Sequence, residues 1–217
     1  MSEDILNRLG VTPRKTAFLE GRQRMDLVGF LLRWEYYQSA LACLESLVPV
    51  NPKLVSLLDD RARAQMALAQ YDAALETMRA RQRIKDSLQA QALVARIHLA
   101  RGNAQEALLI AAQAVSQDPH SALALSLLGD AHLACGDVER ALSTYQRLQT
   151  VRQGYHPYLL GMMQYYEARG ELVTASSYAV RVQQANDPDH PLPVYHVRRL
   201  RDYYRRSGEA NRAQDLD

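Results

Sequence analysis

The sequence predicts an all-α protein built as a solenoid of stacked antiparallel helix pairs. The segment IHLARGNAQEAL at 97–108 is repeated as AHLACGDVERAL at 131–142, and six of the twelve positions are identical at a shift of 34 residues. Small residues recur at almost the same spacing along most of the chain. No alternating apolar run is bounded by hairpin turns, so strand signals are absent. These observations indicate one continuous repeat array rather than a set of ordinary domains.

One small residue in each unit marks the repeats. The markers are Ala40, Ala74, Ala107, Ala141 and Ala175, and a sixth unit has Ala213 after 4 extra residues that fall in the proline-rich stretch at 187–193. The predicted array covers 21–217, with repeats at about 21–54, 55–87, 88–121, 122–155 and 156–189 and a partial repeat at 194–217.

Residues 1–20 precede the array and are expected to form a helical N-terminal extension. Ser2 can cap a short helix that ends at Gly10, and Thr12 with Pro13 suits a second helix start. We expect this extension to cover the apolar end of the first repeat, since an uncovered end of a solenoid leaves apolar side chains in water.

The repeat at 122–155 shows how one unit is expected to fold. Apolar and small residues recur at helical spacing from Leu125 to Leu133, which predicts a first helix of roughly four turns. Gly136 then ends that helix in the left-handed conformation, and Asp137 caps the second helix. Ala141 is small because a larger side chain would push the two helices apart. The turns between repeats are predicted to place a capping residue before a proline at the first helical position, at Asn51–Pro52 and Asp118–Pro119.

Composition and charge exclude several classes of function. Lys+Arg 26 against Asp+Glu 24 gives a net charge of +2, which is too small to imply a polyanionic partner by itself. No apolar run approaches the roughly 18–20 residues of a membrane span, and the first residues lack the features of a signal peptide. Cys43 and Cys135 have neither zinc-ligand nor disulfide-framework spacing. We therefore expect a soluble cytoplasmic protein, and the preference for arginine over lysine is compatible with a GC-rich bacterial genome.

A set of residues at fixed spacing in the repeat at 122–155, with one proline in the unit before, has the pattern of a known family. These residues are Pro119, Leu128, Gly129, His132, Gly136, Ala141 and Tyr145. With them the chain resembles the tetratricopeptide repeat (TPR) family over roughly 21–217. The resemblance implies a right-handed superhelix with a concave surface lined by the first helix of each pair. The chain departs from the pattern where Glu35 and Ala69 replace the turn glycine and where Leu148, Met163 and Arg201 replace small residues.

The resemblance also implies which side chains lie on the concave surface. That surface has charged ends and an apolar centre, which suits an amphipathic helix or an extended peptide of a partner protein. The alternative is that its central leucines only pack under the neighbouring repeats. The predicted partner-binding residues are Asp59, Asp60, Arg63, Leu93, Arg96, Leu127, Asp130, Leu160, Gln164, Arg198, Arg199 and Asp202, with Ala92, Leu123 and Glu167 at equivalent positions.

A basic run, HVRRLRDYYRRSG at 196–208, interleaves arginines with Tyr203 and Tyr204. Arginine beside tyrosine can bind phosphate and stack on bases, so weak nucleic-acid binding is an alternative function. Helical wrapping distributes these arginines around the axis, however, so the favoured interpretation is a solvated terminal helix. A protein-docking surface is a third interpretation.

Histidines and aromatic residues raise two further questions. His98 and His132 share a repeat position, but no carboxylate or thiol set with ligand spacing accompanies them, so we interpret them as packing residues rather than metal ligands. Trp34, beside Tyr36 and Tyr37 at the first turn, is either a packing residue or an interface anchor. The sequence contains no GxxxxGK[ST], GxGxxG, HExxH or GxSxG motif, and we expect no catalytic residue, cofactor or metal.

The sequence therefore predicts a non-enzymatic scaffold or adaptor that binds a protein or peptide partner on the concave surface. Two alternatives remain open. The partial last repeat could expose an apolar face that makes the chain self-associate, and the arginine-rich run could bind nucleic acid weakly.

Overall fold

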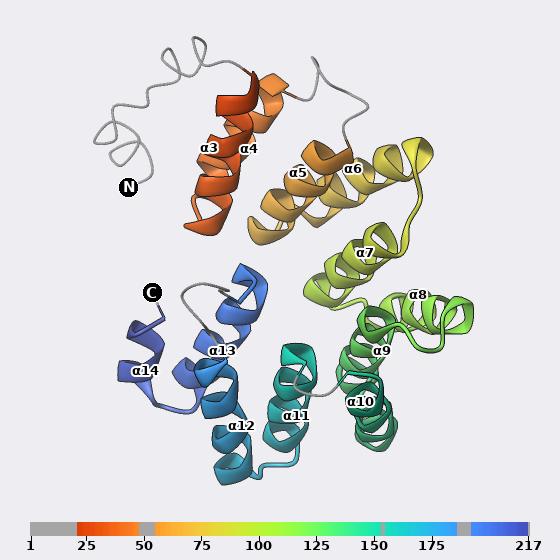
Figure 1. The fold of residues 1–217 in the computed structure, drawn as a ribbon, viewed down its shortest axis with the longest axis vertical. Coiled ribbons are helices and arrows are strands. Elements are labelled where there is room, and N and C mark those ends of the chain that lie inside the picture. The colour runs from red at the N-terminus through yellow and green to blue at the C-terminus, as the bar shows by residue number, and fades with distance from the viewer. Residues whose placement is uncertain (1–20, 48–54, 153–154, 186–191, 217) are drawn as a thin grey trace. The chain divides into compact units, whose positions relative to one another are not determined.

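The computed structural model describes residues 21–47, 55–152, 155–185 and 192–216, and these residues form helices without a strand. The predicted all-α repeat fold is confirmed, because the twelve described helices follow one another in sequential pairs (Figure 1). They belong to two compact units, 1–103 and 104–217, and the boundary falls inside the third predicted repeat. The predicted extension at 1–20 and the turn at Asn51–Pro52 lie outside the described residues.

The first unit contains α3 (Gly21–Arg33), α4 (Tyr37–Leu47), α5 (Val55–Ala67), α6 (Tyr71–Ile84) and α7 (Leu88–Arg101). Each of these helices packs against the next one, and the first helices α5 and α7 also contact each other. A buried cluster from α5, α6 and α7 includes Ala62, Ala74, Met78 and Ile97. The repeat marker Ala74 is fully buried, as expected where two helices approach closely.

The second unit contains α8 (Ala104–Gln117), α9 (Ala122–Ala134), α10 (Val138–Val151), α11 (His156–Ala168), α12 (Leu172–Gln184), α13 (Val194–Arg206) and α14 (Ala210–Gln214). Successive helices pack together, and α11 also contacts the first helices on either side of it, α9 and α13. The markers Ala141, Ala175 and Ala213 are buried in the core of this unit. No helix in the described ranges is long and apolar enough to cross a membrane.

Each described helix pair turns through one residue with a positive φ angle. Gly136 has this conformation, with φ of 79°, and Asp137 caps α10 by accepting a hydrogen bond from the amide of Arg140 at 3.2 Å. Both predictions for this turn are confirmed. Ala69 and Glu35 stand at the equivalent position of earlier pairs and adopt φ of 58° and 60° although they carry a Cβ. The repeat geometry is therefore kept even where the sequence has lost the turn glycine.

The cap predicted at Asp118 is wrong. Its carboxylate accepts a hydrogen bond from the amide of His120 at 3.1 Å, inside the turn that contains Pro119. The cap of α9 is Ser121, whose hydroxyl accepts from the amide of Ala124 at 3.3 Å. Two turn residues follow the proline before the helix begins, so the capping role passes to the side chain that directly precedes α9.

Tyr145 of α10 fills a slot between α9 and α11. A Cβ built on Gly129 would lie 2.4 Å from Cε1 of this ring, and a Cβ built on Gly161 would lie 2.3 Å from the same atom. The ring is fully buried. Because neither glycine has a side chain, the Tyr145 ring fits between α9 and α11. Its hydroxyl then lies within hydrogen-bond distance of Asp130.

The positions that depart from the family pattern are filled in the core. Leu148 and Met163 are fully buried, and Arg201 is also buried. The core of the second unit therefore accommodates larger side chains at positions where the family usually has small ones. Gly129 and Gly161 on neighbouring helices leave room for Tyr145 in the same core.

Candidate functional site

The surface lined by the first helix of each pair is called the inner face here, and α5 and α7 contribute to it in the first unit. Buried Arg81 of α6 binds Asp59 of α5, with Nε of the arginine 2.8 Å from Oδ1 of the carboxylate. Asp60 pairs with Arg63 at 2.8 Å, and the Arg63 side chain is 58% exposed. Burial raises the pKa of Asp60, and the Arg63 guanidinium opposes that rise. Arg63 is therefore available to water, Asp60 is partly buried beside it, and Asp59 is bound to α6 through Arg81.

The apolar residues predicted for the centre of the surface are buried in both units. Leu93 is packed in the α5–α7 cluster, and Leu127 and Leu160 are at most 1% exposed. Ala92 is buried as well, while Arg96 and Leu123 are half-buried. This burial agrees with the alternative in which the leucines pack under neighbouring helices, and it leaves Arg63 and Asp202 among the more exposed predicted residues.

A buried polar cluster occupies the inner face of the second unit. Arg199 of α13 binds Asp130 of α9 through two hydrogen bonds, Nη1 to Oδ2 at 2.9 Å and Nη2 to Oδ1 at 3.1 Å. The side chains of Arg199 and Asp130 are only 11% and 8% exposed. Arg199 also donates to Gln164 of α11, and its guanidinium lies 5.5 Å from the ring centroid of Tyr195. Three predicted site residues thus meet at one point.

Tyr145 completes this cluster from the second helix of the pair. Its hydroxyl donates to Oδ1 of Asp130 at 2.8 Å. Burial, and then the Asp130 carboxylate, raise the pKa of Tyr145 well above its usual value, so the phenol stays protonated. Burial alone would lower the pKa of Arg199, but the adjacent carboxylate outweighs it and the pKa is raised. The cluster is therefore a charged pair with its hydrogen bonds supplied by four helices.

The sequence indicated Asp130, Gln164 and Arg199 but not Tyr145 as a member of the same cluster. Tyr145 belongs to a second helix, which the repeat pattern assigns to the outer layer. The available signal was the pair of glycines, Gly129 and Gly161, 32 positions apart, which flank the ring in the structure.

The arginines of the basic run are mostly engaged with carboxylates. Arg199 binds Asp130, Arg206 binds Glu167 at 3.0 Å, and Arg205 lies 3.8 Å from Asp202. Arg201 is buried and Arg198 is half-buried. The pairing of Arg199, Arg205 and Arg206 with carboxylates of the same unit reduces the charge that these three arginines offer to phosphate groups.

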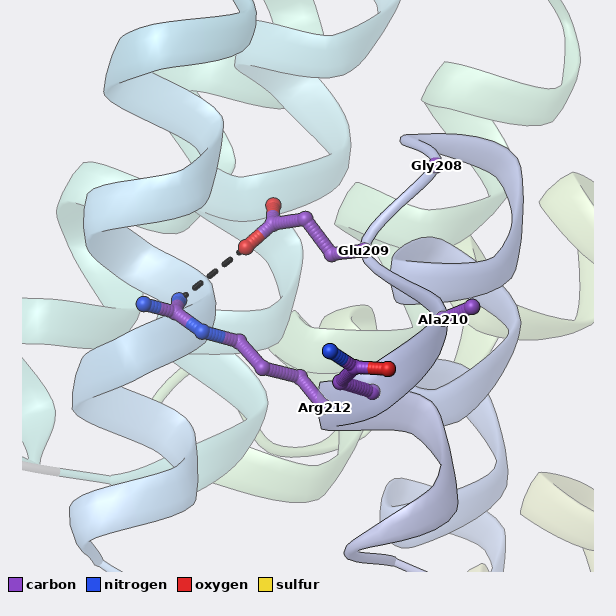
Figure 2. Close-up of a pocket in the computed structure, with 5 residues that line it drawn as sticks. Gly208, Glu209, Ala210 and Arg212 are labelled. Carbon is purple, nitrogen blue, oxygen red and sulfur yellow. Dashed lines mark ion pairs between the residues drawn. The ribbon is translucent and has the colours of Figure 1, made fainter.

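The histidines and the C-terminal pocket offer little reactive chemistry. Burial lowers the pKa of His132, whose Nδ1 has no hydrogen-bond partner among the described residues. No group of three His, Cys, Asp or Glu side chains in the described ranges is placed to bind a metal. A pocket of about 300 Å³ is lined by residues 208–212, and Glu209 and Arg212 in its lining pair with each other at 3.2 Å. Figure 2 shows this ion pair.

The repeat region matches a family of known proteins. Residues 98–176 match the family described as tetratricopeptide repeat. Curated proteins gave no significant match to the sequence. Among solved structures, the chain is similar to a thermophilic TPR protein of Thermus thermophilus, with 18% identity and a TM-score of 0.66 over 83% of this chain and 99% of that chain.

Two other solved structures have the same fold. PilW, a widely conserved type IV pilus biogenesis factor, is 20% identical with a TM-score of 0.60, and the match covers 90% of each chain. MamA of Desulfovibrio magneticus RS-1 is 17% identical with a TM-score of 0.54, over 76% of this chain and 93% of that chain. At these identities the likeness concerns the fold alone. The family match identifies residues 98–176 as tetratricopeptide repeats, and helix pairs with the same recurring turns continue along the rest of the described chain.

Proposed function

We propose that this TPR protein is a non-enzymatic adaptor whose inner face binds a peptide or helix of a partner protein. TPR proteins generally bind other proteins, and this supports the general role. The observation that favours the inner face is its layered construction. In each unit the first helices combine partly exposed charged side chains with buried leucines: Arg63 with Leu93 in the first unit, and Asp202 with Leu127 and Leu160 in the second.

In this proposal the exposed polar residues contact the partner and the buried residues hold them in place. Arg63 and Asp60 in the first unit, and Asp202 and Gln164 in the second, are accessible or partly accessible. Within each unit, packed helices fix the spacing of these residues before binding, so little conformational entropy is lost on that unit's side. Arg199 and Asp130 already satisfy each other's charge, so in this proposal they hold the helices of the surface together and do not contact the partner.

The alternatives make different predictions. Nucleic-acid binding through the basic run requires free arginines, and the pairing of Arg199 and Arg206 with carboxylates argues against it. It would show as an affinity that falls steeply with salt. Self-association would show as a mass that rises with concentration in light scattering.

The test is partner capture from a native, nuclease-treated lysate, followed by mass spectrometry. The inner-face variant is Arg63→Glu/Asp202→Lys. The matched control, Glu76→Lys/Arg79→Glu, exchanges the same charges between two exposed residues of α6, the second helix of its pair. We expect a partner that is retained by the wild type and the control and lost from the inner-face variant, with all three chains melting at similar temperatures. Equal capture by all three would contradict the inner-face proposal.

A further inference from the structure

α3 has apolar side chains on a second side, away from the core of the first unit. Its core side includes Val28, which clusters with Leu44, Leu47 and Leu57. A different stripe at i, i+3 and i+7 consists of Leu27, Phe30 and Trp34, and we call it the α3 stripe. Phe30 is 43% exposed and Trp34 is 55% exposed.

The α3 stripe has the composition of an interface. The rings of Phe30 and Trp34 contact each other, with centroids 6.2 Å apart and planes inclined at 46°. Half-buried Leu27 extends the apolar surface one turn toward the start of the helix. Neighbouring aromatic residues in water are costly unless something covers them, and tryptophan is enriched among residues that dominate binding energy.

A matching apolar face exists in the sequence that precedes α3. In residues 2–10, SEDILNRLG, the apolar residues Ile5, Leu6 and Leu9 fall on one side if the segment is helical, and the polar residues fall on the other. Residues 1–20 lie outside the described part of the chain.

We propose that residues 2–10 dock as a short helix on the α3 stripe, antiparallel to α3. This contact lies within the chain and goes beyond the proposed partner binding. In this orientation Asp4 approaches exposed Arg33 at the end of α3, and Arg8 approaches exposed Asp26 about two turns earlier. Opposite charges therefore face each other at both ends of the docked segment, whereas a parallel orientation would place like charges opposite each other.

The connecting segment is long enough for this arrangement. At 1.5 Å per residue, α3 and Trp34 extend about 20 Å from Gly21, and residues 2–10 as a helix measure about 12 Å. The remaining distance of about 8 Å along α3, together with the spacing of about 8–10 Å between packed helices, is well within reach of residues 11–20. Ten residues span up to about 33 Å when extended.

The test uses the fluorescence of Trp34, which is the only tryptophan in the sequence. Emission maximum and acrylamide quenching are measured on the full chain as wild type, Leu6→Asp and Asn7→Asp. The two variants place the same side chain at adjacent positions, one on the apolar face of the segment and one on its polar face. Neither position belongs to the described core, and far-UV circular dichroism checks that the array remains helical.

We expect Leu6→Asp to move the emission to longer wavelength and to increase quenching, while Asn7→Asp matches the wild type. Identical emission and quenching in the wild type and Leu6→Asp would overturn the proposal. An equal change in both variants would also overturn it, because it would not depend on the apolar face. If wild-type emission instead shifts on dilution, a second copy of the chain covers the stripe and the proposal is wrong. Partner capture is not used, so these outcomes are independent of the proposed function.

Discussion

At the scale of single residues, the second unit depends on the absence of side chains at two positions. Gly129 and Gly161 lie inside helices, where alanine is intrinsically favoured by about 1 kcal/mol. Both glycines face the same Tyr145 ring at distances that no Cβ could occupy. The ring cannot retreat without losing its hydroxyl bond to Asp130. Packing therefore outweighs helix propensity at these sites.

The close packing of Tyr145 against Gly161 predicts opposite effects for two Gly→Ala substitutions. Gly161→Ala forces a methyl group against Tyr145, and we expect a net loss of about 1–3 kcal/mol in the free energy of unfolding, since overpacking exceeds the gain in propensity. Gly29→Ala is the control, because a Cβ there meets nothing within 4 Å, and it should stabilise α3 by up to about 1 kcal/mol. Urea unfolding measures both. If Gly161→Ala raised the free energy of unfolding, the close packing of Tyr145 against Gly161 would be contradicted.

Turn residues without glycine give a second prediction. Ala69 has a φ of 58°, and this left-handed conformation costs a residue with a Cβ about 1–2 kcal/mol. Glycine removes that strain but adds about 0.5–1 kcal/mol of conformational entropy to the unfolded chain. We expect Ala69→Gly to raise the free energy of unfolding by about 0.5–1 kcal/mol, as the difference between the two effects. Gly136→Ala should lower it, and effects of the same sign would contradict this explanation.

His132 predicts how stability changes with pH. Burial lowers its pKa below the ordinary value of 6.5 in the folded chain. Above pH 6.5 the histidine is neutral in both states, so its contribution to stability is fully present. As the pH falls through 6.5, the unfolded chain takes up the proton first, and stability is lost until the folded chain is also protonated. We expect His132→Gln to reduce the loss of melting temperature between about pH 7.5 and pH 5, and exposed His120→Gln to leave it unchanged.

At the scale of helices, the Arg199–Asp130 pair joins the first and third inner helices of the second unit across α11. Removing one partner leaves the other charge buried. We expect Arg199→Leu to cost about 3–5 kcal/mol, and Arg199→Leu/Asp130→Leu to cost less than Arg199→Leu alone, because the double variant buries no unpaired charge.

The exposed Arg206–Glu167 pair is the comparison for the buried Arg199–Asp130 pair. The Arg206 side chain is 55% exposed, so Arg206→Leu should cost less than about 1 kcal/mol. If Arg199→Leu and Arg206→Leu were equally mild in chemical unfolding, the buried pair would not be the contact that holds α13 in place.

The helices themselves were predictable because their signals are local. Periodicity, the turn at Gly136 and the small marker Ala141 each depend on residues within one repeat. The cap at Asp118 was mispredicted because the exact length of a turn is not encoded by the proline alone. The Arg199–Asp130 contact joins residues 69 positions apart, so it follows from how three helix pairs stack. A concave-surface pattern could identify these residues but not reveal that they bind each other.

At the scale of the whole molecule, the chain has two compact units, and each has its own buried ion pair. Arg81 binds Asp59 in the first unit, as Arg199 binds Asp130 in the second. In a repeat array, each helix pair is stabilised mainly by contacts with the adjacent pairs, so a loss of stability in one pair need not spread to distant pairs. The two pairs therefore allow each unit to be weakened separately.

Hydrogen exchange measured by mass spectrometry tests this independence. We expect Arg199→Leu to reduce amide protection in α9, α11 and α13 while α5 and α6 keep theirs, and Arg81→Leu to produce the reverse pattern. The reciprocal design matters because a single variant could weaken one unit simply because that unit is the less stable. If either substitution lowered protection equally throughout the described helices, the chain would unfold as one cooperative body, and the division into two units would have no energetic meaning.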